Sequence, residues 1–159
     1  MPAVTPITAE DDAGLAAAGR LLDRFNQEYD DPSPGAEWLA KRLRTLVGSG
    51  GTDVLLAGDG PDGILAVQFL DGLWSEADVG YVREFYVAPE RRRHGLGSAL
   101  MEAGLGRCRD RGCDHVFLHT DEGDRDAHRL YERFNFSNLT GPFPQTEDRE
   151  LMYVYERRL

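Results

Sequence analysis

The sequence predicts a single mixed α/β domain in which helices flank a central sheet. Three observations support this fold class: the alternation of helix-like and strand-like patterns, the length of 159 residues and a composition with 41% hydrophobic residues. A chain of this length ordinarily forms one domain. That share of apolar residues is sufficient for a core without disulfide bonds. We therefore expect one domain over residues 1–159, with elements in the order β-α-α-β-β-β-α-β-α-β.

Helices dominate the first third of the chain. Residues 4–8 suit a short strand, and Thr8 with Asp11 has the spacing of a capping box that opens a helix. Hydrophobic residues then recur at helical spacing as far as Asp30. A second amphipathic pattern follows a break that is rich in proline, and the glycines of residues 48–51 end it. We expect two consecutive helices here.

The middle of the chain changes to strand patterns. Three strand-like runs are separated by glycine turns, at residues 53–57, 64–70 and 79–87. The third is rich in β-branched and aromatic residues. The later elements are a helix over residues 95–111 with Gly112 as its stop, a strand over 116–119, a helix over 125–134 and a strand over 151–155. The result is a sheet with helices before, within and after its strands.

Composition excludes several classes of function. The formal net charge of −10 disfavours binding to nucleic acid, because an acidic surface repels the phosphate backbone. The N-terminal residues have no signal-peptide pattern and no stretch is apolar enough to span a membrane, which predicts a soluble cytoplasmic protein without membrane partners. Cys108 and Cys113 are five apart, a spacing that fits no metal or redox motif.

One strand-to-helix connection has the features of an anion site. The strand over residues 79–87 leads through three consecutive arginines, residues 91–93, to Gly95 and Gly97 at the start of a helix. Glycines allow a ligand to approach the backbone. The first amides of a helix lack internal partners and attract phosphate groups. A solvated charge run beside an ordinary turn is the simpler interpretation. A dinucleotide-binding turn would need glycine where Leu100 stands.

Two segments resemble a known family. Arg92-x-x-Gly95-x-Gly97 is similar to the Gln/Arg-x-x-Gly-x-Gly/Ala signature of the GNAT superfamily of N-acetyltransferases. The segment from Ala127 to Phe136 resembles the family's Ala-x-x-Leu-Tyr-x-x-x-Gly-Phe pattern, with asparagine in place of the glycine. The resemblance implies a central, mostly antiparallel sheet whose two parallel central strands splay apart. It also implies acetyl transfer from acetyl-coenzyme A to a primary amine by direct attack.

The resemblance implies a binding site for the cosubstrate, acetyl-coenzyme A. The pantetheine arm would lie between the splayed strands, with Val87 N–H polarising the thioester carbonyl. Asp124 stands where relatives often have an asparagine that binds this arm. The expected cosubstrate-binding residues are Phe85, Tyr86, Val87, Arg92, Arg93, His94, Gly95, Leu96, Gly97, Ser98 and Asp124.

Two residues are candidates for catalysis. Glu84 lies three residues before Val87 and could take the proton from the amine, although a surface glutamate paired with Arg83 or Arg91 is nearly as good an interpretation. Tyr131 matches the general acid of the family, which protonates the departing thiolate. A packed helix tyrosine is the alternative.

The acceptor is expected to be a small-molecule amine. The residues that would shape its site, as in the family, lie near Phe25, Tyr29, Trp38, Glu76, Asp78 and the loop over residues 141–149. Acetylation of a protein N-terminus or lysine is an alternative, and so is a sensor that binds acetyl-coenzyme A without turnover. Small dimers are common in the family, so a homodimer is a further outcome that the resemblance allows. No metal is expected, because His115 and His119 lack a third ligand.

Overall fold

The described residues are built around a seven-stranded sheet. The computed structural model describes residues 1–121, 123–138 and 152–159. Within these ranges the strands are β1 Val4–Pro6, β2 Thr52–Ala57, β3 Gly63–Leu70, β4 Val79–Val87, β5 His115–Asp121, β6 Ser137–Asn138 and β7 Met152–Arg158. The helices are α1 Asp12–Glu28, α2 Ala36–Gly48, the 3₁₀ turn η1 Pro89–Arg91, α3 Leu96–Asp110 and α4 Arg125–Arg133.

The sheet contains a single parallel pair among its described strands. Its order is β1-β2-β3-β4-β5-β7-β6, and every neighbouring pair is antiparallel except β4 and β5. A parallel pair needs a crossover connection, and α3 provides it here by leading from the end of β4 back to the start of β5. The predicted mixed fold with a mostly antiparallel sheet is therefore confirmed.

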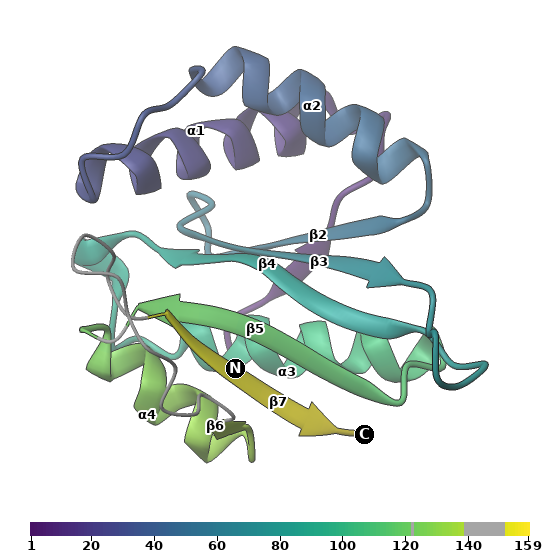
Figure 1. Cartoon of the computed structure of the whole chain (residues 1–159). Coiled ribbons are helices and arrows are strands. Elements are labelled where there is room, and N and C mark those ends of the chain that lie inside the picture. The colour runs from purple at the N-terminus through teal and green to yellow at the C-terminus, as the bar shows by residue number, and fades with distance from the viewer. Residues whose placement is uncertain (122, 139–151) are drawn as a thin grey trace.

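Helices cover both faces of the sheet. Figure 1 shows α1 and α2 on one face and α3 on the other. Along β2 the buried side chains alternate between the two layers: Val54 and Leu56 pack under α1 and α2, whereas Leu55 and Ala57 pack against the α3 layer. Burial on both faces explains why β2 and β3 have nearly continuous apolar sequences.

The structure differs from the sequence prediction at the ends of a few helices and strands. The first helix is capped by Asp11, whose carboxylate accepts a hydrogen bond from Gly14 N, so the predicted capping box beginning at Thr8 was wrong. The 3₁₀ turn η1 and the two-residue strand β6 had no sequence signal. The final strand extends to Arg158, beyond the predicted end at residue 155. Its predicted first residue, 151, lies outside the described residues.

Several predicted turns are confirmed by their backbone angles. Gly112 follows α3 with a φ of +80°, as a glycine stop requires. Asn135 follows α4 with a φ of +63°, so it occupies the left-handed region in place of the glycine of the family pattern. In the described ranges, no helix combines the length and apolarity needed to cross a membrane.

Candidate active site

Strands β4 and β5 are paired for only part of their length. Their parallel ladder ends at the Val82–Leu118 pair. Beyond it β4 continues to Val87 and β5 to Asp121 without pairing to each other. The predicted splay is confirmed. Because a strand offers hydrogen-bonding groups along each edge, the edge of β4 that turns toward β5 has no strand partner over residues 83–87 in the described chain.

A cleft of about 700 Å³ opens at this split. Its walls come from α1, the end of β4, the turn that contains the arginines of residues 91–93, the start of α3, the end of β5 and α4. All the predicted site residues line the cleft except His94 and Leu96. The side chain of His94 folds back onto Arg92 O at 2.8 Å, and that of Leu96 is buried in the core. Leu96 can therefore face a ligand only through its backbone.

The turn before α3 exposes the first amides of the helix. Gly95 is the N-cap with a φ of +81°, and no side chain caps this helix end in the described structure. Helical hydrogen bonding begins with Ala99, whose N–H donates to Gly95 O at 3.0 Å. Gly97 lies so close to α4 that an added Cβ would be 3.2 Å from Leu130 Cδ1. The result is an uncapped helix start that suits an anion.

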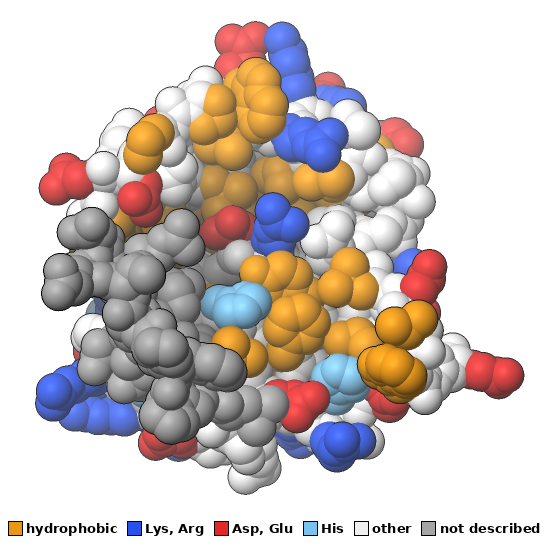
Figure 2. All heavy atoms as spheres, viewed as in Figure 1, with side chains coloured by type: hydrophobic (Ala, Val, Ile, Leu, Met, Phe, Trp, Pro, Cys, Tyr) orange, Lys and Arg blue, Asp and Glu red, His pale blue; other side chains and the backbone are white. Residues whose placement is uncertain are grey.

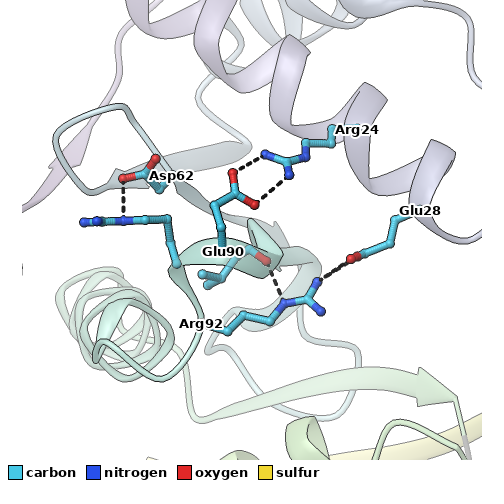
Figure 3. A network of polar contacts seen from close by, with 7 residues as sticks. Arg24, Glu28, Asp62, Glu90 and Arg92 are labelled. Atoms are coloured by element: carbon cyan, nitrogen blue, oxygen red, sulfur yellow. Dashed lines mark hydrogen bonds and ion pairs between the residues drawn. The ribbon is translucent and has the colours of Figure 1, made fainter.

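Two ion pairs connect this turn to α1. Figure 3 shows Arg24 donating to both carboxylate oxygens of Glu90, and Arg92 donating to Glu28. The shortest N–O distances are 2.6 Å and 2.7 Å. Arg92 Nε also donates to Val87 O at 2.9 Å, at the end of β4. The hydrogen bond from Arg24 lowers the pKa of Glu90 to about 2, so that carboxylate stays charged.

The three arginines of the turn therefore have different surroundings. Arg91 pairs with Asp62 at 3.2 Å, and the charge of Arg92 is offset by Glu28. Arg93 lines the cleft and forms no ion pair with any described residue. Its backbone has a φ of +66°. Of the three arginines, Arg93 is therefore the one whose positive charge no described carboxylate offsets, so it can pair with a ligand.

Tyr131 is held in an aromatic cluster at the side of the cleft. Its ring centroid lies 5.5 Å from that of Tyr155, 6.1 Å from that of Phe136 and 6.2 Å from that of Phe85. The residue is 5% exposed. Burial, followed by the nearby charge of Asp124, raises the pKa of the Tyr131 hydroxyl. The phenol is therefore protonated at neutral pH and can donate a proton.

Glu84 lies on the face of β4 that α1 covers. The pairing of β3 with β4 shifts between Ala66 and Val67, so that Ala66 faces Glu84 while Val67 faces Val82. The residue between them, Arg83, forms a bulge, a feature that often re-aims side chains beside active sites. Burial raises the pKa of Glu84, and the neighbouring charge of Arg83 opposes that rise only in part. A raised carboxylate pKa suits a group that takes up protons.

The acetyltransferase (GNAT) family model matches residues 10–136. The chain belongs to the GNAT acetyltransferase family. A crystal structure from Arthrobacter sp. FB24, of a protein that carries the name acetyltransferase, is 37% identical with a TM-score of 0.77, covering 95% of this chain and 96% of that one. The NatC complex bound to Gag peptide and CoA is 19% identical with a TM-score of 0.77, covering 99% and 98% of the two chains, and shows the same fold.

A curated relative of this GNAT domain is the mycothiol acetyltransferase of Thermobispora bispora. The two are 38% identical over 121 residues, which are 75% of this chain and 36% of that protein. The chain thus spans little more than a third of this relative's length. Together the comparisons support the predicted enzyme class and cosubstrate: an N-acetyltransferase domain that uses acetyl-coenzyme A.

Asp124 is the main departure from the GNAT pattern. Its carboxylate accepts a hydrogen bond from Ala127 N at 3.2 Å and caps α4, as its acidic turn predicts. The carboxylate also lines the cleft, where it can accept but not donate hydrogen bonds. In the described residues, no three acidic, histidine or cysteine side chains gather as they would around a metal. Asp124 therefore acts on the cleft through its charge and on α4 through its cap.

Sequence reasoning missed several residues of the cleft. Tyr81 and His119 both line it and contact each other, yet His119 had been considered only with His115 as a metal pair. Phe25 and Tyr29 line the cleft as predicted. Trp38, which is 55% exposed, Glu76 and Asp78 do not. The predicted acceptor loop over residues 141–149 lies outside the described residues. A local sequence pattern cannot predict a contact between two residues that are 38 positions apart on different strands.

Proposed function

We propose that the domain transfers an acetyl group from acetyl-coenzyme A to the primary amine of a small, cationic molecule. The observation that carries this proposal is the cleft at the β4–β5 split. The uncapped start of α3 and Arg93, which forms no ion pair with a described residue, line this cleft. Glu84 lines it too. A donor with a pyrophosphate and an amine acceptor can therefore meet in one cavity.

The donor fits the turn and the open strand edge. The amides before Ala99 suit the pyrophosphate, and the side chain of Arg93 adds a positive charge. Residues 85–87 of β4 offer backbone groups to the pantetheine arm, as a strand does to an added partner. We assign to Val87 N–H the polarisation of the thioester carbonyl, because a fixed backbone donor stabilises the oxyanion that forms there.

The chemical steps use one acid and one base. Glu84 takes a proton from the ammonium group, directly or through water, and the neutral amine attacks the thioester carbon. The C–N bond forms, a tetrahedral intermediate collapses, and the C–S bond breaks. Tyr131 gives its proton to the departing thiolate. The raised pKa keeps the Tyr131 hydroxyl protonated at neutral pH, so the proton is in place when the thiolate leaves, and the tyrosinate regains a proton from solvent.

Five carboxylate and five arginine side chains line the cleft, and two of the arginines, Arg91 and Arg92, are paired with carboxylates outside that lining, which leaves carboxylates for a cationic acceptor. Acidic side chains line the cleft from three elements: Asp31 follows α1, Glu84 lies on β4 and Asp121 ends β5. Phe25 and Tyr29 add aromatic surface from α1. A cavity of about 700 Å³ shared with the donor leaves room for a small molecule. Because curated relatives are named mycothiol acetyltransferases, the amine substrate of mycothiol acetylation is one of the acceptors to be tested.

The test is release of free thiol from acetyl-coenzyme A with a panel of amines. The panel contains polyamines, aminoglycosides, amino-acid derivatives, the amine substrate of mycothiol acetylation and peptides with a free N-terminus or lysine. We expect turnover with one small cationic amine and background hydrolysis without amine. Turnover only with peptides would refute the proposed acceptor class.

A sensor without turnover is the second candidate, favoured by Asp124. The carboxylate cannot provide the amide donor that relatives offer to the pantetheine arm. The same panel separates the two functions. Thermal stabilisation by acetyl-coenzyme A with no thiol release for any amine would favour the sensor.

A further inference from the structure

Thr120 is a buried polar residue in the open half of the strand split. It lies on β5, two residues beyond Leu118, the last residue of β5 that pairs with β4. Thr120 is 7% exposed and lines the cleft. The other edge of β5 is fixed, because its pairing with β7 continues as far as Asp121. A polar side chain is therefore held at the gap where β4 no longer accompanies β5.

The side chain of Thr120 belongs to the buried face of β5. Val116, Leu118 and Thr120 are buried, whereas the residues that alternate with them are more exposed. Val116 and Leu118 pack in the core cluster that includes Tyr131 of α4. Figure 2 shows charged and histidine side chains among hydrophobic ones on the opposite face of the sheet, below α1 and α2. Thr120 therefore faces the layer of α3 and α4, away from those charges.

The hydroxyl of Thr120 has no hydrogen-bond partner among the described residues. Unlike the Tyr86 hydroxyl, which is sealed in the interior without a partner, the Thr120 oxygen keeps some accessible surface. A buried hydroxyl that bonds to nothing is unfavourable, because it has given up its hydrogen bonds to bulk water. Since Thr120 lines the cleft, the partner available to its hydroxyl is a molecule that enters the cleft.

Asp124 lies beside the same end of β5. Its N–H donates to Asp121 O at 3.2 Å, so the loop after β5 turns back toward the strand. Its Oδ1 accepts from Ala127 N, and no described residue donates a hydrogen bond to Oδ2. A carboxylate has about four acceptor sites, so capacity remains. The wall of the cleft thus offers a hydrogen-bond donor at Thr120 and an acceptor at Asp124.

An amide group matches this pair of side chains, because its carbonyl accepts a hydrogen bond and its N–H donates one. The pantetheine arm of acetyl-coenzyme A contains amide groups. The phosphate groups of the same molecule do not fit, because the charge of Asp124 repels them. An ammonium group would fit Asp124 but would leave the proton of the Thr120 hydroxyl unused.

We propose that Thr120 and Asp124 together hold an amide of the pantetheine arm, with the Thr120 hydroxyl donating to the amide carbonyl and the Asp124 carboxylate accepting from the amide N–H. This inference deepens the proposed function, on which it rests for the identity of the ligand. Thr120 supplies the donor that an aspartate at position 124 cannot supply. The aspartate then keeps its contact with the arm by accepting a hydrogen bond, while it still caps α4.

The first test measures the affinity for coenzyme A by calorimetry, which does not depend on turnover. Thr120→Val removes the hydroxyl, and we expect about 10-fold weaker binding, the upper end for one hydrogen bond. Thr120→Ser keeps the hydroxyl and should keep most of the affinity. Thr52→Val is the matched control, because Thr52 is 6% exposed and does not line the cleft. Unchanged affinity in Thr120→Val, or an equal loss in the control, would overturn the inference.

The second test separates contact with the arm from effects on the fold or on the nucleotide. Adenosine 3′,5′-bisphosphate lacks the pantetheine arm, so Thr120→Val should bind it as tightly as the wild type does. Without ligand, Thr120→Val should be at least as stable in thermal unfolding, because its hydroxyl bonds to no described residue. A lower Tm together with equal losses for both ligands would make the role of Thr120 structural and overturn the inference.

The third test asks whether Thr120 and Asp124 bind the same group. Asp124→Asn keeps a residue that can cap α4 and adds an amide donor. In the Thr120→Val background it should therefore restore most of the lost affinity for coenzyme A. Absence of any rescue would overturn the pairing of the two residues on one amide.

Failure of this inference differs from failure of the proposed function. Coenzyme A binding that weakens about 10-fold in Thr120→Val, beside no thiol release with any amine, would support the inference and count against turnover. Turnover with an amine, beside unchanged coenzyme A affinity in Thr120→Val, would support the function and overturn the inference. A loss confined to the KM of the amine would assign Thr120 to the acceptor and overturn it as well.

Discussion

Replacing Arg92 by alanine should mainly weaken the fold, although the sequence motif assigns this arginine to the cosubstrate. Arg92 contacts Glu28 through Nη2 at 2.7 Å and 3.0 Å, donates from Nε to Val87 O, and lies 5.7 Å from the centre of the Tyr86 ring. These contacts join α1, the end of β4 and the turn (Figure 3). The guanidinium is therefore already engaged within the protein.

The expected loss can be worked out contact by contact. The side chains of Arg92 and Glu28 are 42% and 25% exposed, so the ion pair is worth about 0.5 kcal/mol. The hydrogen bond to the Val87 carbonyl adds about 1 kcal/mol, and the contact with Tyr86 adds about 0.5 kcal/mol. Arg92→Ala should thus lose about 2 kcal/mol of unfolding free energy. For a domain of this size that lowers Tm by about 4–8 °C.

The assay compares Arg92→Ala with Arg93→Ala by thermal unfolding and by calorimetric titration with acetyl-coenzyme A. Arg93 lines the cleft and has no ion pair with a described residue, so its replacement should weaken binding with little change in Tm. Glu28→Gln should cost less than Arg92→Ala, because the hydrogen bond to Val87 remains. If Arg92→Ala abolished binding and left Tm unchanged, the guanidinium would have to leave Glu28 for the pyrophosphate, and our reasoning would be refuted.

Three further variants test the cleft. Tyr131→Phe should lower kcat by about 10²-fold, at the low end for loss of a general acid, with little change in the calorimetric affinity for acetyl-coenzyme A. Gly97→Asp should abolish that binding, because a side chain there meets Leu130 and adds a negative charge at the anion site. Glu84→Gln should lose less rate as pH rises, since more of the amine is then already neutral, and kcat measured from pH 6 to 9 checks this.

Each of these variants has a result that would count against the assignment. An unchanged kcat in Tyr131→Phe would remove Tyr131 as the acid, and persistent binding in Gly97→Asp would place the pyrophosphate elsewhere. A loss of rate in Glu84→Gln that is the same at every pH would exclude that carboxylate as a base. Gly106→Asp is the matched control for Gly97→Asp, because an added Cβ at Gly106 meets no atom within 4 Å.

The raised pKa of Glu84 also has a consequence for stability. Because burial places the folded pKa above the unfolded one, the folded state binds more protons between the two values. This carboxyl group therefore favours folding at low pH, and the benefit is lost as pH rises through the folded pKa. The unfolding free energy of Glu84→Gln minus that of the wild type should therefore be larger at pH 8 than at pH 4. Chemical unfolding at both values measures it, and an unchanged difference would contradict the burial argument.

Local patterns were sufficient to predict much of the fold. The strand over residues 79–87 and the helix start at Gly95 could be predicted because their signals are hydrophobic alternation and glycine chemistry, which need no distant partner. The left-handed Asn135 was predictable for the same reason. The start of α1 was misplaced by one turn, because Thr8 and Asp11 are both acceptable caps and only the latter reaches Gly14 N.

The missed features depend on distant contacts. Glu28 and Arg92 are 64 residues apart, and Tyr81 and His119 are 38 apart. Nothing near either arginine in the sequence shows that Arg92 pairs with Glu28 of α1 while Arg93 forms no ion pair with a described residue. The roles of Glu84 and Tyr131, the single domain, a homodimer and a cytoplasmic location stay predictions.

The edge of β4 that no described strand pairs with would make a bound cosubstrate part of the sheet. A molecule that binds along residues 83–87 supplies the hydrogen bonds that β5 supplies to residues 79–82. Only the folded chain can present that edge, so occupancy shifts the unfolding equilibrium: cosubstrate at 100 times its Kd adds about 2.7 kcal/mol to stability. The lifetime of this protein against proteolysis would then rise and fall with the supply of acetyl-coenzyme A around it.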